Sequence, residues 1–186
     1  MKTYAFIFAR GGSKGIHRKN LLEINGISLV EHSIRLAKKV KSIDKVFIST
    51  EDSEIASVSV NAGAELIHRP SHLAKDDSPE WLSWQHAINH VIANHGEFQR
   101  FISLPATSPL RDLTDIEKCL DKLSTENDIV ISITPSKRNP FFNIVRMNKN
   151  NVVELVSQEE QQSITRRQDT PETFDITTVA YVAKPE

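Results

Sequence analysis

The sequence predicts an α/β fold in which a doubly wound, mostly parallel sheet is covered by helices on both faces. Short apolar runs, typical of strands buried on both faces, alternate with helical patterns over the first two thirds of the chain. Capping residues and glycines separate the two kinds of segment. The length of 186 residues is enough for one domain with its own core.

The predicted strands are the apolar runs of the chain. Those that alternate with helices are Tyr4–Phe8, Lys45–Thr50, Ala64–His68, Arg100–Leu104 and Asp128–Ile133. These runs are too apolar to be half exposed, so we expect both faces of each strand to be covered, as in a parallel sheet. Near the end of the chain, Thr177–Ala183 is expected to return as a further strand.

The helices between these strands have recognisable ends. Ser28–Glu31 and Thr114–Glu117 have the spacing of capping boxes, and Ser78-Pro79 places a cap before a proline at the first helical position. Gly63 and Gly96 stand where helices are expected to stop. Strands and helices should therefore follow one another with short connections.

One helical pattern raises the question of a metal site. Its apolar stripe, which we expect to face the core, consists of Trp81, Trp84, Ile88, Val91 and Ile92. His86 and His90 stand four residues apart, which is a spacing found in metal sites, but they lie largely opposite the stripe. Because no third ligand is near in sequence, we expect a solvated helical face rather than a metal centre.

After Pro135 the alternation of strands and helices stops. Residues 136–172 hold two short β-like pieces, Phe142–Met147 and Val152–Val156, separated by the turn-forming Asn148–Asn151. A hairpin of this size has no core of its own. It is expected to be an arm that leans on a partner subunit, with a flexible surface excursion as the alternative.

Composition limits the partners of the chain. It carries 23 Lys and Arg against 24 Asp and Glu, a net charge of −1, so no general attraction to nucleic acid or to an anionic membrane is expected. No apolar run has membrane-spanning length, and no signal peptide is recognisable, which predicts a cytoplasmic protein. The one cysteine, Cys119, lies on an apolar helical stripe and is expected to pack in the core.

The loop after the first predicted strand is rich in glycine and in positive charge. It reads ARGGSKGIHRKN over residues 9–20 and carries Arg10, Lys14, Arg18 and Lys19. Glycines reach positive φ and can turn several amide N–H groups toward one point, which suits a phosphate chain. The ATPase and dinucleotide patterns GxxxxGK[ST] and GxGxxG do not fit this loop. A solvated basic turn is the alternative.

Five segments, in order along nearly the whole chain, resemble the cytidylyltransferases that activate acidic keto-sugars, the acylneuraminate cytidylyltransferase or CMP-sialic acid synthetase family. The segments are ARGGSKGIHRKN at 9–20, ISTEDSEIA at 48–56, HRPSHLAKDDSP at 68–79, PATSPLR at 105–111 and RRQDTPE at 166–172. The resemblance implies a Rossmann-like nucleotidyltransferase domain over residues 1–186, with residues 136–172 inserted as a protruding β-hairpin dimerisation arm. It also implies CTP and a nine-carbon acidic keto-sugar as substrates, Mg²⁺, and a homodimer.

The resemblance further implies roles for individual residues. Those implied to hold the triphosphate are Arg10, Gly11, Gly12, Ser13, Lys14, Lys19 and Asn20. Of these, Arg10 and Lys19 are the implied catalytic cations. The residues implied to lie along the cytidine are Arg69 and Ser78, and those implied to face the acidic sugar are Ser108 and Arg111. Arg167 would reach from one subunit into the site of its partner.

The chain departs from the family pattern in three places. Pro105 stands where the family commonly has Gln, and residues 177–181 read TTVAY where members selective for sialic acid often read NGAIY. The acidic pair Asp-x-Asp that binds Mg²⁺ in the family would lie beyond the strand at Thr177–Ala183. We therefore expect the C-terminal part of the family domain to be missing, and we leave the metal ligands unassigned.

The reaction implied is attack by the anomeric hydroxyl of the sugar on the α-phosphorus of CTP, with pyrophosphate leaving. This reaction depends mainly on positioning the two substrates and on neutralising the charge of the phosphates, and it needs no covalent nucleophile. Two alternatives remain at this point. The chain could be a truncated or degenerate CTP-binding module without full catalysis, or a nucleotidyltransferase of the molybdopterin type, whose expected nucleotide is GTP.

Overall fold

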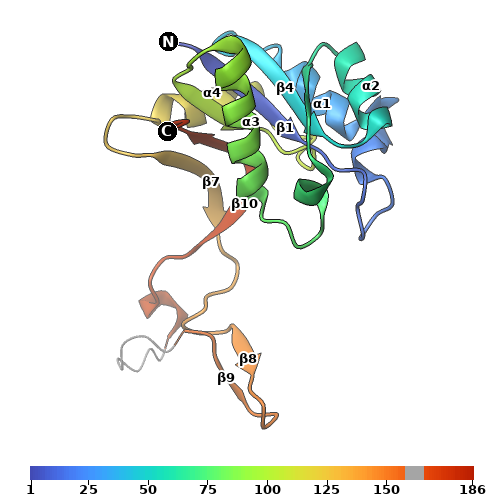
Figure 1. The fold of residues 1–186 in the computed structure, drawn as a ribbon. Coiled ribbons are helices and arrows are strands. Elements are labelled where there is room, and N and C mark those ends of the chain that lie inside the picture. Colours follow the sequence, from blue (N-terminus) through green and yellow to red (C-terminus); the bar gives the residue numbers. More distant parts are fainter. Residues whose placement is uncertain (158–165) are drawn as a thin grey trace. The chain divides into compact units, whose positions relative to one another are not determined.

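The computed structural model describes residues 1–157 and 166–186, which form two compact units. The larger contains residues 1–132 and 178–186, and the smaller lies within residues 133–177. Figure 1 labels the helices and strands of both units. The segment predicted as an inserted arm, residues 136–172, falls inside the smaller unit.

One six-stranded sheet carries the fold. Its strands are β1 (Thr3–Phe8), β4 (Lys45–Thr50), β5 (Glu65–His68), β6 (Arg100–Ser103), β7 (Ile129–Pro135) and β10 (Phe174–Ala183). They lie in the order β5-β4-β1-β6-β10-β7. The pairs β1–β4, β1–β6 and β4–β5 are parallel, and β10 runs antiparallel to β6. The predicted strands and the mostly parallel sheet are confirmed, with small shifts of the strand ends.

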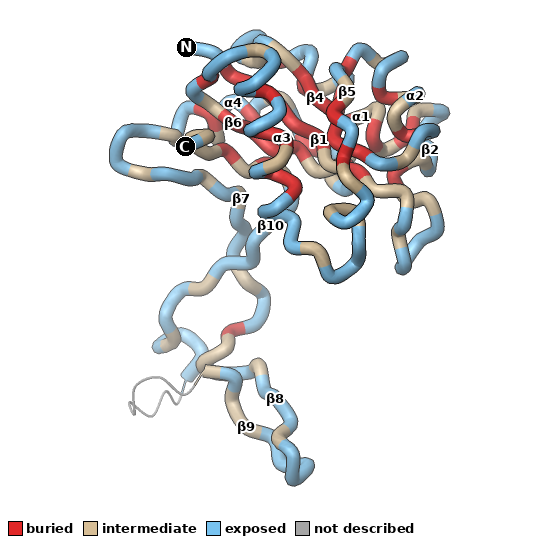
Figure 2. Tube along the Cα trace, in the orientation of Figure 1, coloured by how far each residue is buried: buried red, intermediate tan, exposed pale blue. Residues whose placement is uncertain are grey.

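Helices cover both faces of the sheet, which confirms the doubly wound arrangement. They are α1 (Leu29–Ala37), α2 (Ser53–Asn61), α3 (Glu80–His95) and α4 (Leu113–Lys122). On one face, Ile7 of β1 belongs to an apolar cluster with Ile34 of α1, Ile55 of α2 and Ile116 of α4. On the other face, Phe6 belongs to an aromatic cluster that packs against α3. The buried residues, red in Figure 2, therefore follow the central strands.

The last strand of the sheet departs from the prediction. The segment Asp128–Ile133 forms β7, but the expectation that both of its faces are covered is wrong. Ile129, Ile131 and Ile133 remain 39% to 51% exposed. The reason is position, because among the described strands β7 lies at the edge of the sheet and pairs with β10 alone. An apolar run alone cannot tell an edge strand from a central one.

The predicted helix ends at Ser28, Gly63 and Gly96 are confirmed. The Ser28 hydroxyl caps α1 by accepting a hydrogen bond from the N–H of Glu31 at 3.3 Å. The second half of the predicted box is not formed among the described residues, since the Glu31 carboxylate accepts from Arg35 Nε at 2.9 Å. Gly63 follows the last turn of α2 with a φ of 92°, and Gly96 follows α3 with a φ of 76°. Both angles lie in the region that favours glycine.

Two other capping predictions are wrong. α3 begins at Glu80, one residue later than expected, and no side chain caps it, so the Ser78 hydroxyl is not used there. The capping box of α4 consists of Asp112 and Asp115, two residues before the predicted Thr114–Glu117 box. Asp112 accepts from the N–H of Thr114 at 3.1 Å, and Asp115 accepts from the N–H of Asp112 at 3.0 Å. A carboxylate caps at least as well as a threonine, so the earlier pair takes the free amides.

The buried face of α3 lies to one side of the predicted stripe. It consists of Ser83, Trp84, Ala87, Ile88 and Val91. Trp81 and Ile92 are 56% and 38% exposed, so their assignment to the core is wrong. Cys119 of α4 packs against the apolar cluster as expected, and burial raises the pKa of its thiol. No helix within residues 1–157 and 166–186 combines the length and the apolar character that crossing a membrane requires.

The smaller unit contains the predicted hairpin. Strands β8 (Val145–Met147) and β9 (Val153–Leu155) pair antiparallel, with Met147 opposite Val153. The turn between them closes through the Asn148 N–H, which donates to the Val152 carbonyl at 2.9 Å, and Asn151 has a φ of 58°. The hairpin is confirmed, although both strands are shorter than expected. Residues 158–165, which complete the predicted arm toward Arg166, lie outside the described residues.

The position of the α4 cap can be tested by stability. Asp112→Ala should lower the free energy of unfolding by about 1 kcal/mol, because two amides at the helix start lose their partners. Thr114→Ala serves as the matched control and should cost less than half as much. Urea denaturation of both variants measures the difference. An equal or larger loss in Thr114→Ala would mean that the helix starts where the sequence pattern placed it.

Candidate functional site

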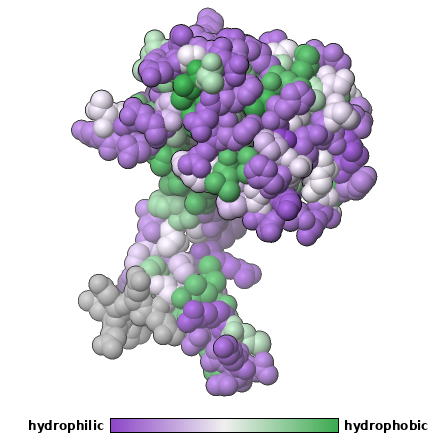
Figure 3. Space-filling view, viewed as in Figure 1, coloured by the Kyte–Doolittle hydropathy of each residue, from purple (hydrophilic) through white to green (hydrophobic). Residues whose placement is uncertain are grey.

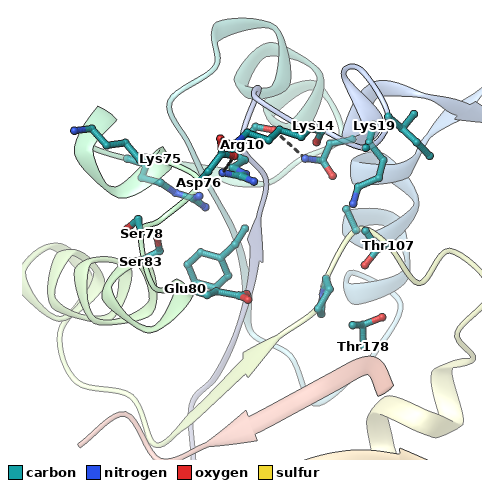
Figure 4. A pocket seen from close by; sticks show the side chains of 18 of the residues that line it. Arg10, Lys14, Lys19, Lys75, Asp76, Ser78, Glu80, Ser83, Thr107 and Thr178 are labelled. Carbon is teal, nitrogen blue, oxygen red and sulfur yellow. Dashed lines mark hydrogen bonds and ion pairs between the residues drawn. The ribbon is translucent and has the colours of Figure 1, made fainter. Parts of the chain in front are cut away.

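A pocket of about 660 Å³ lies at the carboxyl end of β1, within the larger unit. Its wall comes from the loop after β1, from the segment between β5 and α3, from the loop after β6, and from β10. Figure 4 shows the labelled side chains converging on this space from opposite sides. The carboxyl ends of parallel strands are where open α/β sheets bind ligands, which agrees with the expectation for the first loop.

Most of the residues implied to hold a triphosphate line this pocket. They are Arg10, Ser13, Lys14, Lys19 and Asn20, all from the loop after β1. Asn20 is buried, and its side-chain amide donates to the Arg10 carbonyl at 3.0 Å, which ties the two ends of the loop together. Lys19 and Asn20 belong to a short 3₁₀ helix, η1 (Lys19–Leu21). The loop therefore presents its cations from a fixed frame.

The glycines of this loop act differently from the expectation. None of Gly11, Gly12 and Gly15 has a positive φ, so the expectation of positive φ in this loop is wrong. Gly11 and Gly12 are not among the residues that line the pocket. The left-handed residue of the loop is Arg18, with a φ of 48°. Gly11 is needed for space, because a Cβ there would come within 2.5 Å of a carboxylate oxygen of Asp52. Contact of Gly11 and Gly12 with a nucleotide stays a prediction.

One carboxylate bridges two of the loop cations. Asp76 binds Arg10 Nη1 and Lys14 Nζ, each at 2.7 Å and each through a different oxygen. The hydrogen bond from Lys14 and the nearby positive charges lower the pKa of Asp76, so it stays ionised at neutral pH. Among the described residues Lys19 has no such ion pair. An incoming anion would thus meet a free ammonium at Lys19 and would compete with Asp76 for Arg10 and Lys14.

The residues implied to lie along the cytidine also line the pocket. Arg69 is buried, and it donates from Nε to the Ser49 hydroxyl at 3.2 Å and from Nη2 to the Ser49 carbonyl at 2.7 Å. Its guanidinium lies 5.6 Å from the centre of the Phe8 ring. Burial lowers the pKa of Arg69. Ser78, which does not cap α3, contributes to the same wall, as does Tyr181 of β10.

Ser108 and Arg111, implied to face the sugar, do not line the pocket but support it. The Ser108 hydroxyl and the Thr178 hydroxyl are 2.8 Å apart. Arg111 Nη2 donates to the carbonyls of Pro105 and, at 3.5 Å, Thr178. Pro105 and Thr178 do line the pocket. Arg111 therefore holds the loop after β6 against β10 from behind.

Arg111 is also an isolated buried charge. Within the part of the chain that the structure describes, its Nε and Nη1 atoms have no hydrogen-bond partner and no carboxylate forms an ion pair with it. Burial lowers its pKa to about 10. Direct contact of Ser108 or Arg111 with a substrate stays a prediction.

Arg167 lies in the smaller unit. It begins the short helix η3 (Arg167–Asp169), and its Nη2 donates to the Lys137 carbonyl at 3.0 Å. Its neighbour Arg166 pairs with Asp169 at 2.8 Å. Both interactions are internal to this unit. A role of Arg167 in the site of a partner subunit stays a prediction.

The described residues do not form a metal site by themselves. Nowhere in residues 1–157 and 166–186 do three His, Cys, Asp or Glu side chains stand in a group that could hold an ion. His86 is half-buried and its pKa is lowered, chiefly by burial, whereas His90 is exposed. Mg²⁺ bound with a nucleotide takes one or two protein carboxylates. The pocket offers Asp76, whose two oxygens are already ion-paired, and Glu80.

Sequence reasoning missed several residues of this pocket. They include Phe8, Asp76, Glu80, Thr178 and Tyr181. Asp76 lies inside the segment HRPSHLAKDDSP, and Thr178 and Tyr181 lie inside TTVAY. Both segments had already been compared with the family pattern, so these residues could have been included among the candidates. Glu80 stands next to the first of these segments and looks like an ordinary helix-start residue. Its place in the pocket follows from the packing of α3.

Comparison with known proteins agrees with this site. The cytidylyltransferase family model matches residues 4–183. The chain is 33% identical to the post-translational flagellin modification protein B of Campylobacter coli, over 96% of this chain and 75% of that protein. It is 34% identical to the CMP-N,N'-diacetyllegionaminic acid synthase of Campylobacter jejuni, with the same coverage.

A solved structure shows the same fold. The CMP:2-keto-3-deoxy-manno-octonic acid synthetase complexed with CTP has a TM-score of 0.71 and 16% identity, covering 100% of this chain and 75% of that one. The family match includes the loop after β1, the pocket wall and β10. The resemblance first seen in five segments is thus confirmed, and the chain belongs to the cytidylyltransferase family.

Proposed function

We propose that this protein transfers CMP from CTP to the anomeric hydroxyl of an acidic α-keto sugar and releases pyrophosphate. The observation that carries the proposal is the pocket at the end of β1, which Arg10, Lys14, Lys19, Arg69 and Ser78 line together in a member of the cytidylyltransferase family. The cations of the first loop suit the phosphates, and Arg69 and Ser78 suit the nucleoside. The relative from C. jejuni is named for a product of this kind.

The chemistry proposed for these residues is charge stabilisation. The anomeric oxygen bonds to the α-phosphorus and loses its proton to solvent, while the bond from the α-phosphorus to the bridging oxygen breaks and pyrophosphate leaves. The leaving group gains negative charge, which Arg10 and Lys19 are placed to offset. Lys14 adds to the same field. No covalent intermediate with the protein is required.

The sugar would enter beside the loop after β6 and β10. Pro105, Thr107 and Thr178 line the pocket there. Pro105 has no side-chain amide, and its carbonyl already accepts from Arg111. The threonine hydroxyls are therefore the groups left to meet sugar hydroxyls on this side. We propose a nine-carbon keto-acid related to sialic acid, with legionaminic acid derivatives as the first to test, because the C. jejuni relative is named for one.

We also propose that Mg²⁺ accompanies CTP, held mainly by phosphate oxygens, where it would neutralise charge on the triphosphate. The described carboxylates do not supply a donor set, so no step is assigned to the ion.

A cytoplasmic location and the lack of nucleic-acid or membrane partners stay predictions. A CTP-binding module without catalysis is the remaining alternative. The match to the cytidylyltransferase family argues against a nucleotidyltransferase of the molybdopterin type.

The proposed reaction has a direct test. With CTP and Mg²⁺, the chain should release pyrophosphate when given N,N'-diacetyllegionaminic acid or N-acetylneuraminic acid, and not when the sugar is left out. The release should be slow, because the described residues supply no set of Mg²⁺ ligands. An enzyme-coupled pyrophosphate assay measures the rate, with GTP in place of CTP as the nucleotide control. Binding of CTP without release for any acidic keto-sugar would favour the binding-module alternative.

The roles of the pocket charges predict two variants with opposite effects on CTP affinity. Lys19→Ala should weaken binding by about 1.5–3 kcal/mol, the range for a hydrogen bond to a charged group. Asp76→Asn should strengthen binding in metal-free buffer, because Arg10 and Lys14 lose their internal anion. Calorimetric titration measures both, with the exposed Lys118→Ala as a charge control. Unchanged affinity in Lys19→Ala would contradict the triphosphate assignment.

We propose that the protein is a homodimer formed through the smaller unit. Val145, Met147 and Val153 share one face of the hairpin and are 54% to 66% exposed, while the opposite face carries the Arg146–Glu154 ion pair at 3.0 Å. Apolar surface, green in Figure 3, is visible on this unit. An exposed apolar face beside a charged one is typical of an interface.

Sedimentation at several concentrations tests the dimer. The unmodified chain should sediment as a dimer, and the double change Met147→Glu with Val153→Glu should produce monomers, since it places charge on the apolar face. Lys149→Glu in the exposed turn is the matched control and should leave the dimer intact. A monomer at every concentration of the unmodified chain would refute the proposal.

A further inference from the structure

The pocket contains a second carboxylate that the proposed chemistry does not use. Glu80 is the first residue of α3 and lines the pocket. In Figure 4, Glu80 and Ser78 lie on one side of the pocket, and Lys19 and Thr107 lie on the other. The acidic side chain is therefore at the nucleoside end rather than among the cations of the first loop.

One oxygen of Glu80 is held in place. Trp84, one turn further along α3, donates from its indole N–H to Glu80 Oε1 at 3.2 Å. Trp84 is buried, and its ring centre lies 5.8 Å from that of Tyr181 and 6.2 Å from that of Phe8. Among the described residues, Glu80 Oε2 has no hydrogen bond. The carboxylate is thus anchored on one oxygen with the other oxygen available.

The negative charge of Glu80 shifts the pKa values of Tyr181 and Arg69, which line the same pocket. Burial raises the pKa of Tyr181, and Glu80 raises it further. For Arg69, burial lowers the pKa, and both Glu51 and Glu80 oppose that effect. A buried guanidinium, a phenol and a carboxylate therefore border the same small space, which also has the Phe8 ring on its wall. This set offers donors and an acceptor beside an aromatic surface.

These groups match one pyrimidine better than the other. Cytosine carries an amino group, a donor, where uracil carries a carbonyl oxygen, an acceptor. An ionised carboxylate only accepts hydrogen bonds. Arg69 only donates, and the O2 atom it could bind is common to both bases. Of the two charged groups, Glu80 is therefore the one whose chemistry tells the bases apart.

We propose that Glu80 accepts a hydrogen bond from the exocyclic amino group of cytosine and thereby selects CTP over UTP. The inference rests on the proposed use of CTP. With UTP, the base would bring a carbonyl oxygen against the carboxylate, which leaves both acceptors unpaired and opposes binding. Glu80 at the helix start also interacts favourably with the helix dipole, so its test must read base selectivity rather than stability.

The test compares the affinities for CTP and UTP in three proteins. The unmodified chain should bind CTP at least about 10-fold more tightly than UTP, the effect of one hydrogen bond to a charged group. Glu80→Gln keeps an oxygen for Trp84 and gains an amide N–H that can donate to uracil. It should lower the CTP-to-UTP affinity ratio to near unity, with weaker CTP binding and stronger UTP binding. Calorimetric titration gives both affinities.

Glu51→Gln is the matched control. Glu51 also acts on Arg69 and is not part of the pocket wall, and a glutamine can still accept from the Gly11 N–H that Glu51 binds at 2.8 Å. Its affinity ratio should stay that of the unmodified chain. An equal fall of the ratio in both variants would overturn direct readout and indicate a general effect of charge near Arg69.

The remaining outcomes separate this inference from the proposed function. If the unmodified chain binds CTP but Glu80→Gln leaves the ratio unchanged, the role of Glu80 is refuted and the function stands. If the unmodified chain binds no CTP, both are refuted. Circular dichroism of Glu80→Gln shows whether α3 is intact, and a folded variant with an unchanged ratio is the decisive negative result.

Discussion

The burial of β1 on both faces is the constraint on which the larger unit depends. β1 lies between β4 and β6, and its central residues Ala5, Phe6 and Ile7 are fully buried. Helices on both sides leave the strand ends as the only route to solvent. The polar loop after β1 must therefore emerge at the same edge as the loops that follow β5 and β6. The pocket is a consequence of this arrangement, because the loops that meet at the edge enclose it.

Opposite charges give the pocket its polarity. The cations of the first loop gather at one end, and Asp76 partly neutralises them until an anion arrives. In Figure 4, Glu80 lies on the side of the pocket away from Lys19, and the Arg69 guanidinium lies 5.6 Å from the centre of the Phe8 ring. A nucleoside triphosphate has the same division, with charge at one end and a flat base with a few polar atoms at the other. This match supports the proposed orientation of CTP, with its phosphates toward the first loop and its base toward Glu80.

Contacts within and behind its wall keep the pocket in shape. Arg111 binds the carbonyls of Pro105 and Thr178 and so joins two segments far apart in the chain. Asn20 closes the first loop on Arg10, and Gly11 lets that loop pass beside Asp52. Such contacts cost little when formed within a rigid fold, and they fix the positions of the atoms that line the pocket. In the smaller unit, the buried Asn139 has a comparable role, since its amide donates to Thr170 and Pro171.

The sequence by itself determined the features that depend on local chemistry. Apolar runs specify strands, glycine specifies the ends of α2 and α3, and the cations of the first loop are visible in its sequence. The family resemblance implied seven residues for the triphosphate, and five of them line the pocket. Tertiary structure decided what depends on neighbours distant in the chain. The edge position of β7 leaves its isoleucines exposed. The packing of α3 leaves Trp81 exposed and brings Glu80 to the pocket. Asp76 forms an ion pair with Arg10, which is distant in the sequence. The physical reason is that burial and ion pairing belong to pairs of segments, and no single segment contains the information about its partner.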